Sequence, residues 1–284
     1  MTMSCFKEKE FHARRNGLDI YCLAYIPENT QLAARDEAGA LRFPTIIIGH
    51  GYGGSYQDNL NCAERYAKEG FASISFDFCG GTPFAKSQGR TEDMSVVTER
   101  DDMIAVFNAV LSQEFVDPGR IVLWGESMGG YVAALAAAAI AEANREAKQP
   151  DLPVPAALVL FYPAFNIRDE VHSSFGFYDA IKDQPRRDIL LGKCFAQDIW
   201  DLDTWHEIPK YKGPVLILHG DSDDVVPIGY SEKTRNVYAA RPAEEGSAPA
   251  AVTYKVTSGA GHGFFNETGA FADRIVTDFL KAVL

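Results

Sequence analysis

The sequence predicts an α/β protein whose mostly parallel sheet is flanked by helices on both faces. Three observations predict this fold. Short apolar runs rich in Val and Ile alternate with helical patterns along the chain. Connections that contain helices join parallel rather than antiparallel strands. The 284 residues, 46% of them hydrophobic, are enough for one large core. We therefore expect a single domain that covers residues 1–284.

The elements follow from their patterns in chain order. A hairpin is expected first, with strands at 5–11 and 18–26 joined near Arg15-Asn16-Gly17, which is a turn sequence. Residues 27–43 are interpreted as a surface excursion. Six further strands complete an eight-stranded sheet, at 44–49, 71–77, 120–124, 156–161, 214–218 and 252–256. Helices are predicted at 57–69, 95–113, 131–143, 228–240 and 269–284.

One segment breaks the alternation of strands and helices. Residues 163–212 are too long for a simple connection, so we expect an inserted lid or cap. The segment is rich in aromatic residues, which either select an aromatic substrate group or form a small core of the insert itself. The aromatic residues are Phe165, Phe175, Phe177, Tyr178, Phe195, Trp200, Trp205 and Tyr211.

The composition excludes several classes of function. A formal net charge of −12 leaves no basic stripe for nucleic acid and no attraction to anionic membranes. No apolar run approaches the ~20 residues of a membrane span. The first ten residues lack the apolar region of a secretory signal, and the five cysteines show no CxxC spacing. These features favour a cytoplasmic protein with reduced thiols.

The pentapeptide Gly125-Glu126-Ser127-Met128-Gly129 has the pattern of a nucleophile elbow. An apolar run precedes it and an alanine-rich helical stretch follows, which is the required order of strand, turn and helix. The turn is so tight that only small residues fit at 125 and 129. Five residues with three fixed positions also recur by chance, so the flanking context carries the assignment of Ser127 as a nucleophile.

A serine hydroxyl needs a base and a carboxylate that orients the base. His262 lies in the glycine-flanked run 259–265 after the last strand, which suits a base that reaches a distant serine. The carboxylate has three candidates after the strand 214–218, namely Asp221, Asp223 and Asp224.

Among the other histidines, His219 is expected to be structural and His50 to position a loop, while His172 and His206 lie in the insert.

Backbone N–H groups must also stabilise the oxyanion that forms during attack on a carbonyl group. The elbow predicts that one donor is the N–H of Met128. We assign the second donor to Tyr52, in the glycine-rich run 50–54 after a predicted strand. The competing interpretation is a phosphate-binding loop, which the absence of G-x-G-x-x-G and Gly-Lys-Ser/Thr patterns disfavours.

The run 219–227, which reads His-Gly-Asp-Ser-Asp-Asp-Val-Val-Pro, is similar to a signature of α/β-hydrolase esterases and peptidases. The resemblance places the fixed acid on Asp223.

Nearly the whole chain resembles the α/β-hydrolase superfamily, and it is most similar to bacterial cinnamoyl and feruloyl esterases. This similarity rests on the segments 50–52, 76–80 and 93–99 and on the position of the insert. Those esterases usually have His and Gln around the serine, where this chain has Glu126 and Met128.

The resemblance implies a serine carboxylesterase that works through an acyl-enzyme, with hydroxycinnamoyl (feruloyl) esters as candidate substrates. Two alternatives remain at this point. One is an acyl-peptide hydrolase or aminopeptidase-like serine peptidase, and the other is a non-catalytic ligand receptor on the same fold. The expected partner is a small-molecule ester, and neither nucleic acid nor a membrane is expected to bind. The sequence leaves open whether the protein forms a homodimer. No cofactor is implied, and no metal, because no HExxH or paired-His spacing occurs.

Overall fold

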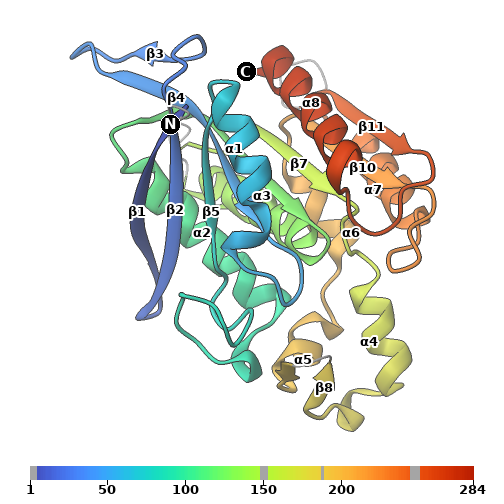
Figure 1. Cartoon of the computed structure of the whole chain (residues 1–284). Helices are drawn as coiled ribbons and strands as arrows, with labels where there is room; N and C mark the ends of the chain where they lie inside the picture. The colour runs from blue at the N-terminus through green and yellow to red at the C-terminus, as the bar shows by residue number, and fades with distance from the viewer. Residues whose placement is uncertain (1–4, 148–152, 187–188, 244–249) are drawn as a thin grey trace.

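A nine-stranded sheet forms the centre of the protein in a computed structural model that describes residues 5–147, 153–186, 189–243 and 250–284 (Figure 1). Its main path runs β1-β2-β5-β4-β6-β7-β10-β11, and the short β3 pairs with β4. A separate two-stranded sheet pairs β8 with β9. The strands are β1 Phe6–Arg15, β2 Leu18–Pro27, β3 Ala34–Arg35, β4 Leu41–Gly49, β5 Ala72–Phe76, β6 Val116–Glu126, β7 Ala157–Phe161, β8 Gln184–Arg186, β9 Ile189–Leu191, β10 Val215–Gly220 and β11 Val252–Thr257.

The predicted N-terminal hairpin is present. Strands β1 and β2 pair antiparallel from Phe6 opposite Pro27 to Arg15 opposite Leu18. The two turn residues, Asn16 and Gly17, both have positive φ, of 50° and 86°. This is the conformation for which Asn-Gly turns are selected, because their twist matches that of the flanking strands.

The rest of the main path is parallel except where β2 meets β5. The six strands predicted after the hairpin are all present, and all but β11, whose residues are half-buried or exposed, contain buried residues. The expected surface excursion 27–43 is wrong in part, because β3 and the start of β4 form a short antiparallel pair. Both residues of β3 are exposed, so this pair buries no apolar face that the sequence pattern could have revealed.

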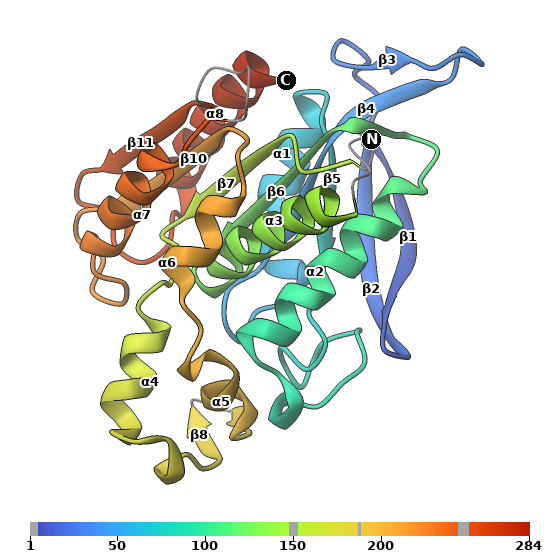
Figure 2. The ribbon, with the colours of Figure 1, turned by 180° about the vertical axis from the view of Figure 1, so that it is seen from behind.

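Helices cover both faces of the sheet (Figures 1 and 2). Helices α1 and α8 contact one another on one face, and α2 packs against α3 on the other. The helices are α1 Leu60–Lys68, α2 Val96–Leu111, α3 Met128–Glu146, α4 Ile167–Phe175, α5 Cys194–Trp200, α6 Thr204–Glu207, α7 Gly229–Ala240 and α8 Asn266–Val283. Short 3-10 helices lie at Tyr56–Asn59, Thr91–Asp93, Tyr178–Ala180 and Ile208–Lys210.

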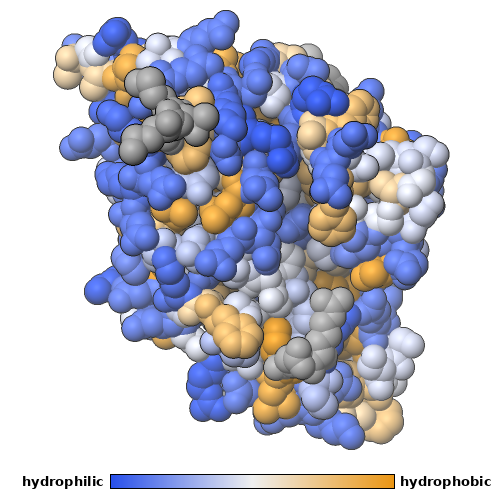
Figure 3. Space-filling view, viewed as in Figure 1, coloured by the Kyte–Doolittle hydropathy of each residue, from blue (hydrophilic) through white to orange (hydrophobic). Residues whose placement is uncertain are grey.

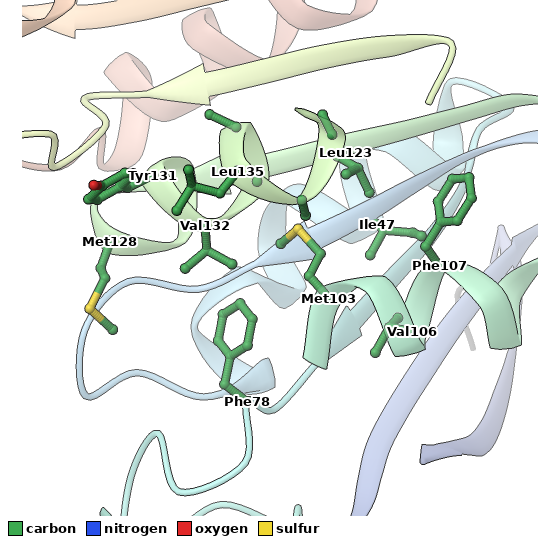
Figure 4. Packing of buried hydrophobic residues seen from close by; sticks show 14 of the residues in the cluster. Ile47, Phe78, Met103, Val106, Phe107, Leu123, Met128, Tyr131, Val132 and Leu135 are labelled. Carbon is green, nitrogen blue, oxygen red and sulfur yellow. The ribbon is translucent and has the colours of Figure 1, made fainter. Parts of the chain in front are cut away.

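A dense apolar core fixes the sheet to helices α2 and α3 (Figure 4). Met103 and Phe107 of α2 pack toward Ile47 of β4 and Leu123 of β6, and all four side chains are 1% exposed or less. Fully burying such a side chain is worth about 1.5–3 kcal/mol. The strand that ends directly before Ser127 and the helix that starts after it are therefore firmly held.

The insert, residues 163–212, contains α4, the β8–β9 pair, α5 and α6, and its residues 187–188 lie outside the described part. Its outer part, with α4, the β8–β9 pair and α5, projects beyond the main sheet, whereas α6 contacts α3 of the body (Figures 1 and 2). Figure 3 shows hydrophilic side chains over most of the molecular face, with hydrophobic residues interspersed toward the insert. Phe177 and Tyr178 of the insert are 67% and 45% exposed. The outer part of the insert is thus an appendage of the body, whereas α6 and the 3-10 helix after it pack on α3.

Candidate active site

Ser127 lies in the strained turn that the elbow pattern predicts. It follows the last residue of β6 and has φ 52° and ψ −122°, a conformation that non-glycine residues rarely adopt. A methyl group on Gly125 would overlap the carbonyl of Gly129, and one on Gly129 would overlap the carbonyls of His50 and Gly49. The close approach of these backbones explains both glycines of the motif.

Ser127, His262 and Asp223 form one continuous chain of hydrogen bonds. The Nε2 atom of His262 lies 2.9 Å from the Ser127 Oγ, and its Nδ1 lies 2.8 Å from the Asp223 Oδ2. An ionised carboxylate can only accept, so Nδ1 carries the proton and Nε2 is left to accept from the serine hydroxyl. The structure therefore brings together the three side chains that the sequence singled out.

Asp223 is held as a carboxylate by its own loop. Its Oδ1 accepts the N–H groups of Val225 at 2.9 Å and Val226 at 2.8 Å, and its side chain is fully buried. Burial alone would raise the pKa of Asp223, but the hydrogen bonds from Val226, His262 and Val225 hold that pKa below its ordinary value.

The two other acid candidates point elsewhere. Asp221 accepts the N–H of Gly259 at 2.6 Å and so braces the loop that carries His262. Asp224 is exposed. Of the three carboxylates, only Asp223 contacts the imidazole, as the resemblance predicted.

Two buried histidines position backbone near the site. His219 lies 2.6 Å from Ser231 Oγ through Nδ1 and donates from Nε2 to the Val226 carbonyl, which fixes the loop of Asp223. His50 donates from Nδ1 to the Gly51 carbonyl and accepts the Phe78 N–H. Burial lowers the pKa of both imidazoles, so both are neutral supports. The structural and positioning roles predicted for them agree with these contacts.

The predicted oxyanion donors lie on either side of the serine. Met128 is the first residue of α3, and an α-helix leaves its first N–H groups without an intrahelical acceptor. A Cβ atom on Gly51 would lie 3.3 Å from the Ser127 Cβ, so the backbone that precedes Tyr52 passes close to the nucleophile. Tyr52 and Met128 both line the cavity at Ser127. Their role as oxyanion donors stays a prediction.

A cavity of about 710 Å³ opens at Ser127 and extends to both sides of it. One side, which we call the insert side, is lined by Ala164, Asn166, Ile167, Glu170, Arg186, Phe195, Val225 and Val226. The other side, which we call the helix side, lies against α1 and α8 and is lined by Asn61, Arg65, Trp124, Glu126, Phe264 and Asp273. A substrate with two different halves could therefore span the nucleophile.

Glu126 is a site residue that sequence reasoning noted only as a departure from the esterase pattern. Its Oε1 accepts from the Asn59 amide at 3.2 Å and its Oε2 from the Tyr162 hydroxyl at 2.7 Å. Burial raises the pKa of its carboxyl group. Its place directly before the serine is the signal that could have found it, because that position lies at the floor of the cavity.

Tyr162 connects Glu126 to the imidazole. The tyrosine has a positive φ of 34°, which is rare for a bulky residue, and its ring meets the His262 ring edge-on with centroids 4.8 Å apart. Strain of this kind persists only where the surroundings impose it. The ring of His262 is thus held from one side by Asp223 and from another by Tyr162.

The aromatic residues of the insert mostly serve packing. Of the eight singled out from the sequence, Phe195 is the one that lines the cavity at Ser127. Phe165 packs between Tyr131 and Trp205, and the Tyr211 hydroxyl donates to the Pro155 carbonyl. His172 and His206 do not line this cavity, although the sequence left contact with a substrate open for them. The structural interpretation of the aromatic residues therefore holds for most of them.

Among the described residues, no group of three or more His, Cys, Asp or Glu side chains is arranged to hold a metal ion. None of the helices in the described ranges has both the length and the apolar character needed to span a bilayer.

Comparisons with known proteins agree with this architecture. Residues 46–274 match the sequence profile described as "Alpha/beta hydrolase family". The "Quorum-quenching protein AidA" of Acinetobacter baumannii is 33% identical over 122 residues, which are 42% of this chain. The matched segments cover only 36% of the length of the first curated relatives, AidA included.

Solved structures share the fold over nearly the whole chain. Est1E from Butyrivibrio proteoclasticus, solved with bound ferulic acid, superposes with a TM-score of 0.76 at 21% identity, covering 96% of this chain and 98% of Est1E. Thermogutta terrifontis esterase 2, phosphoramylated by tabun, superposes with a TM-score of 0.65 at 17% identity, covering 100% of this chain and 96% of the esterase. At such identities the likeness shows the fold alone.

Proposed function

The chain belongs to the alpha/beta hydrolase family, as its sequence predicts, and we propose that it is a serine carboxylesterase. One observation carries the proposal. The Ser127 hydroxyl, in its strained turn, is hydrogen-bonded to His262, which is in turn hydrogen-bonded to a buried Asp223, and the serine faces a cavity large enough for a small ester. The solved esterase among the structures of the same fold adds support.

The geometry suits a two-step displacement. His262 removes the proton of Ser127 as the Oγ attacks the ester carbonyl, and the N–H groups of Tyr52 and Met128 stabilise the resulting oxyanion. Asp223 holds the imidazole in the required tautomer and stabilises its positive charge. The imidazolium then returns the proton to the leaving alcohol. Water repeats the cycle on the acyl-enzyme and releases the acid.

We further propose hydroxycinnamoyl esters as a candidate substrate class. The ferulic acid bound to Est1E, a protein of the same fold, motivates this choice. On the insert side, Phe195 and Ile167 offer an apolar wall. Asn166 lines the same side, and its buried Oδ1 has no hydrogen-bond partner in the described part of the chain, which a phenolic hydroxyl that reached it would supply.

Turnover of p-nitrophenyl acetate tests the esterase proposal. The protein should release p-nitrophenol, and Ser127→Ala should abolish the release, because the nucleophile is lost. Ser112→Ala, which removes an exposed hydroxyl at the end of α2, is the matched control and should be as active as the wild type. Ligand binding without any turnover in the wild type would instead favour a receptor.

A second assay separates the substrate classes. Methyl ferulate, p-nitrophenyl butyrate and alanine p-nitroanilide are compared by kcat/KM. The hydroxycinnamoyl proposal predicts that methyl ferulate is cleaved with a kcat/KM at least equal to that of the aliphatic ester. A large preference for the aliphatic ester would remove the hydroxycinnamoyl class, and a preference for the anilide would favour a peptidase.

A further inference from the structure

The helix side of the cavity carries a polar lining that the displacement mechanism does not use. It lies between α1 and α8 and is continuous with the space at Ser127. Its floor is the end of β6, where Trp124 and Glu126 are two residues apart and therefore point to the same face of the sheet. The distal wall contains Arg65 and Asp273.

Trp124 presents a donor that nothing within the described residues accepts. Its side chain is 2% exposed and lines the cavity, yet its indole N–H has no hydrogen-bond partner there. Leaving a buried donor unpaired costs about 1–3 kcal/mol, and the great majority of such groups are paired. The nitrogen itself is covered, so a ligand oxygen in the cavity would satisfy it after a small movement of the lining side chains.

Acceptors for the hydrogen of a hydroxyl group lie on the same side. The Glu126 carboxyl accepts one hydrogen bond on each oxygen and keeps lone pairs for further donors. Asp273, which is 4% exposed, accepts from Tyr66 and is paired with Arg65. The helix side thus combines donors and acceptors, which is the chemistry that hydroxyl groups require, since each hydroxyl both donates and accepts.

We propose that the helix side of the cavity is a subsite for a hydroxylated alcohol, which makes the substrate an ester of a polyol. The subsite rests on the proposed esterase function. An alkyl alcohol would leave the Trp124 N–H unpaired and would bury the Glu126 carboxyl against hydrocarbon. An alcohol that carries an ammonium group would also offer no acceptor to Trp124 and would lie beside the Arg65 guanidinium.

The leaving group is assigned to the helix side because this side borders the imidazole. Tyr162, which holds Glu126, meets the His262 ring, and Phe264 packs against Tyr162 with centroids 5.1 Å apart. The alcohol oxygen must receive its proton from His262, so the alcohol half has to start next to that ring. The acyl half is then directed to the insert side, lined by Ile167 and Phe195.

The test compares glyceryl monobutyrate with propyl butyrate, which share the acyl group and differ in the hydroxyl groups of the alcohol. The wild type should prefer the glyceryl ester in kcat/KM. Trp124→Phe removes the indole N–H and keeps an aromatic ring, so it should reduce this preference by about three- to tenfold, the value of one hydrogen bond. Glu126→Gln, which keeps the shape of the side chain, should reduce the same ratio.

Trp205→Phe is the matched control, because Trp205 packs on Phe165 outside the cavity, and it should leave the ratio unchanged. Both kcat/KM values are measured on the same protein sample. A misfolded fraction of a variant therefore lowers both values equally and cancels in their ratio. The proposal is overturned if Trp124→Phe and Glu126→Gln leave the ratio unchanged, or if Trp205→Phe changes it equally. It is also overturned if butyrylcholine is preferred to the glyceryl ester. The same holds if the substitutions change kcat/KM only for esters whose hydroxyl groups are on the acyl half.

Binding to the Ser127→Ala protein separates this inference from the esterase proposal. Calorimetric titration with glyceryl monobutyrate and propyl butyrate measures the subsite without turnover. Tighter binding of the glyceryl ester that is lost with Trp124→Phe would support the subsite even if the wild type hydrolysed neither ester. Equal binding of the two esters would overturn the subsite even if the wild type hydrolysed both.

Discussion

The carboxyl ends of the sheet strands, which we call the sheet edge, and the insert differ in how firmly they hold the residues around Ser127. At the sheet edge, Ser127 follows directly on β6, Asp223 lies in the loop after β10, and His262 follows β11 in a loop braced by Asp221. The insert is joined to the body by α5, which contacts α2, and by α6, which contacts α3, whereas α4 packs on α5 inside the insert. In the proposed esterase, the chemistry then depends on the sheet, and the outer part of the insert is less constrained and can determine which acyl group enters.

The largest expected effect comes from breaking the sheet edge. Asp223→Asn should lower kcat for p-nitrophenyl acetate by about 10⁴-fold, because an amide can stabilise the wrong tautomer of His262. Asp224→Asn, an exposed neighbour on the same loop, should keep wild-type kcat. Comparable losses in both variants would mean that the loop, and not the carboxylate beside the imidazole, matters.

The next effect concerns the stability of the body and its dependence on pH. Glu99 of α2 is 1% exposed, and neither carboxyl oxygen has a partner within the described residues. Burial, and then the nearby Asp102, which is itself paired with Arg15, raise the pKa of Glu99 well above its ordinary value of 4.5. The contribution of the protonated Glu99 to the free energy of unfolding is therefore fully present below pH 4.5. It is lost as the pH rises from there through the raised pKa.

Glu99→Gln removes the group that titrates. At pH 8 the variant should be more stable than the wild type by at least about 1 kcal/mol, because the neutral amide does not titrate and each unit by which the pKa of Glu99 is raised is worth about 1.4 kcal/mol. The advantage should shrink at pH 4.5. Urea unfolding at both pH values measures it, with the exposed Glu114→Gln as the control. A wild type whose stability rises over this range relative to Glu99→Gln would contradict the assignment.

A smaller effect is expected from the insert side of the cavity. Phe195→Leu should raise KM for methyl ferulate by up to about tenfold, because ring contacts are worth about 0.5–1.5 kcal/mol. Its kcat for p-nitrophenyl acetate should stay near the wild-type value. Phe177→Leu, in an exposed part of the insert, should change neither quantity. If Phe195→Leu slowed acetate hydrolysis as strongly as ferulate hydrolysis, the separation of chemistry from selectivity would fail.

The smallest effect is expected at the ion pair between Arg186 and Glu170, which are 46% and 40% exposed. Water screens such a pair, so Arg186→Ala should change the free energy of unfolding by less than about 1 kcal/mol. Urea unfolding measures this change. A larger loss would show that Arg186 stabilises the protein mainly through another contact, such as its position over the ring of Tyr52, and not through this pair within the insert.

The sequence determined the sheet edge far better than the insert. Buried strands, the glycines of the elbow and the glycine-flanked His262 leave local patterns, because strand periodicity and tight turns restrict the residue types. Asp223 could be separated from Asp221 and Asp224 only by resemblance, since the choice depends on how the loop folds back on the N–H groups of Val225 and Val226.

Features of the cavity escaped sequence reasoning for a different reason. The partners of Glu126, which are Asn59 and Tyr162, come from distant elements, so no spacing predicts them. The packing roles of Phe165 and Tyr211 also depend on contacts between elements. Local patterns predict elements and turns, but which aromatic residues reach a cavity is decided by tertiary packing.

Covalent labelling by diethyl p-nitrophenyl phosphate tests most directly that the arrangement at the sheet edge activates Ser127. After exposure of the protein, peptide mass spectrometry should find one diethylphosphoryl group, on Ser127, and labelling should be far slower in His262→Ala because the base is missing. A label on another residue, no label at all, or equally fast labelling without His262 would contradict the account.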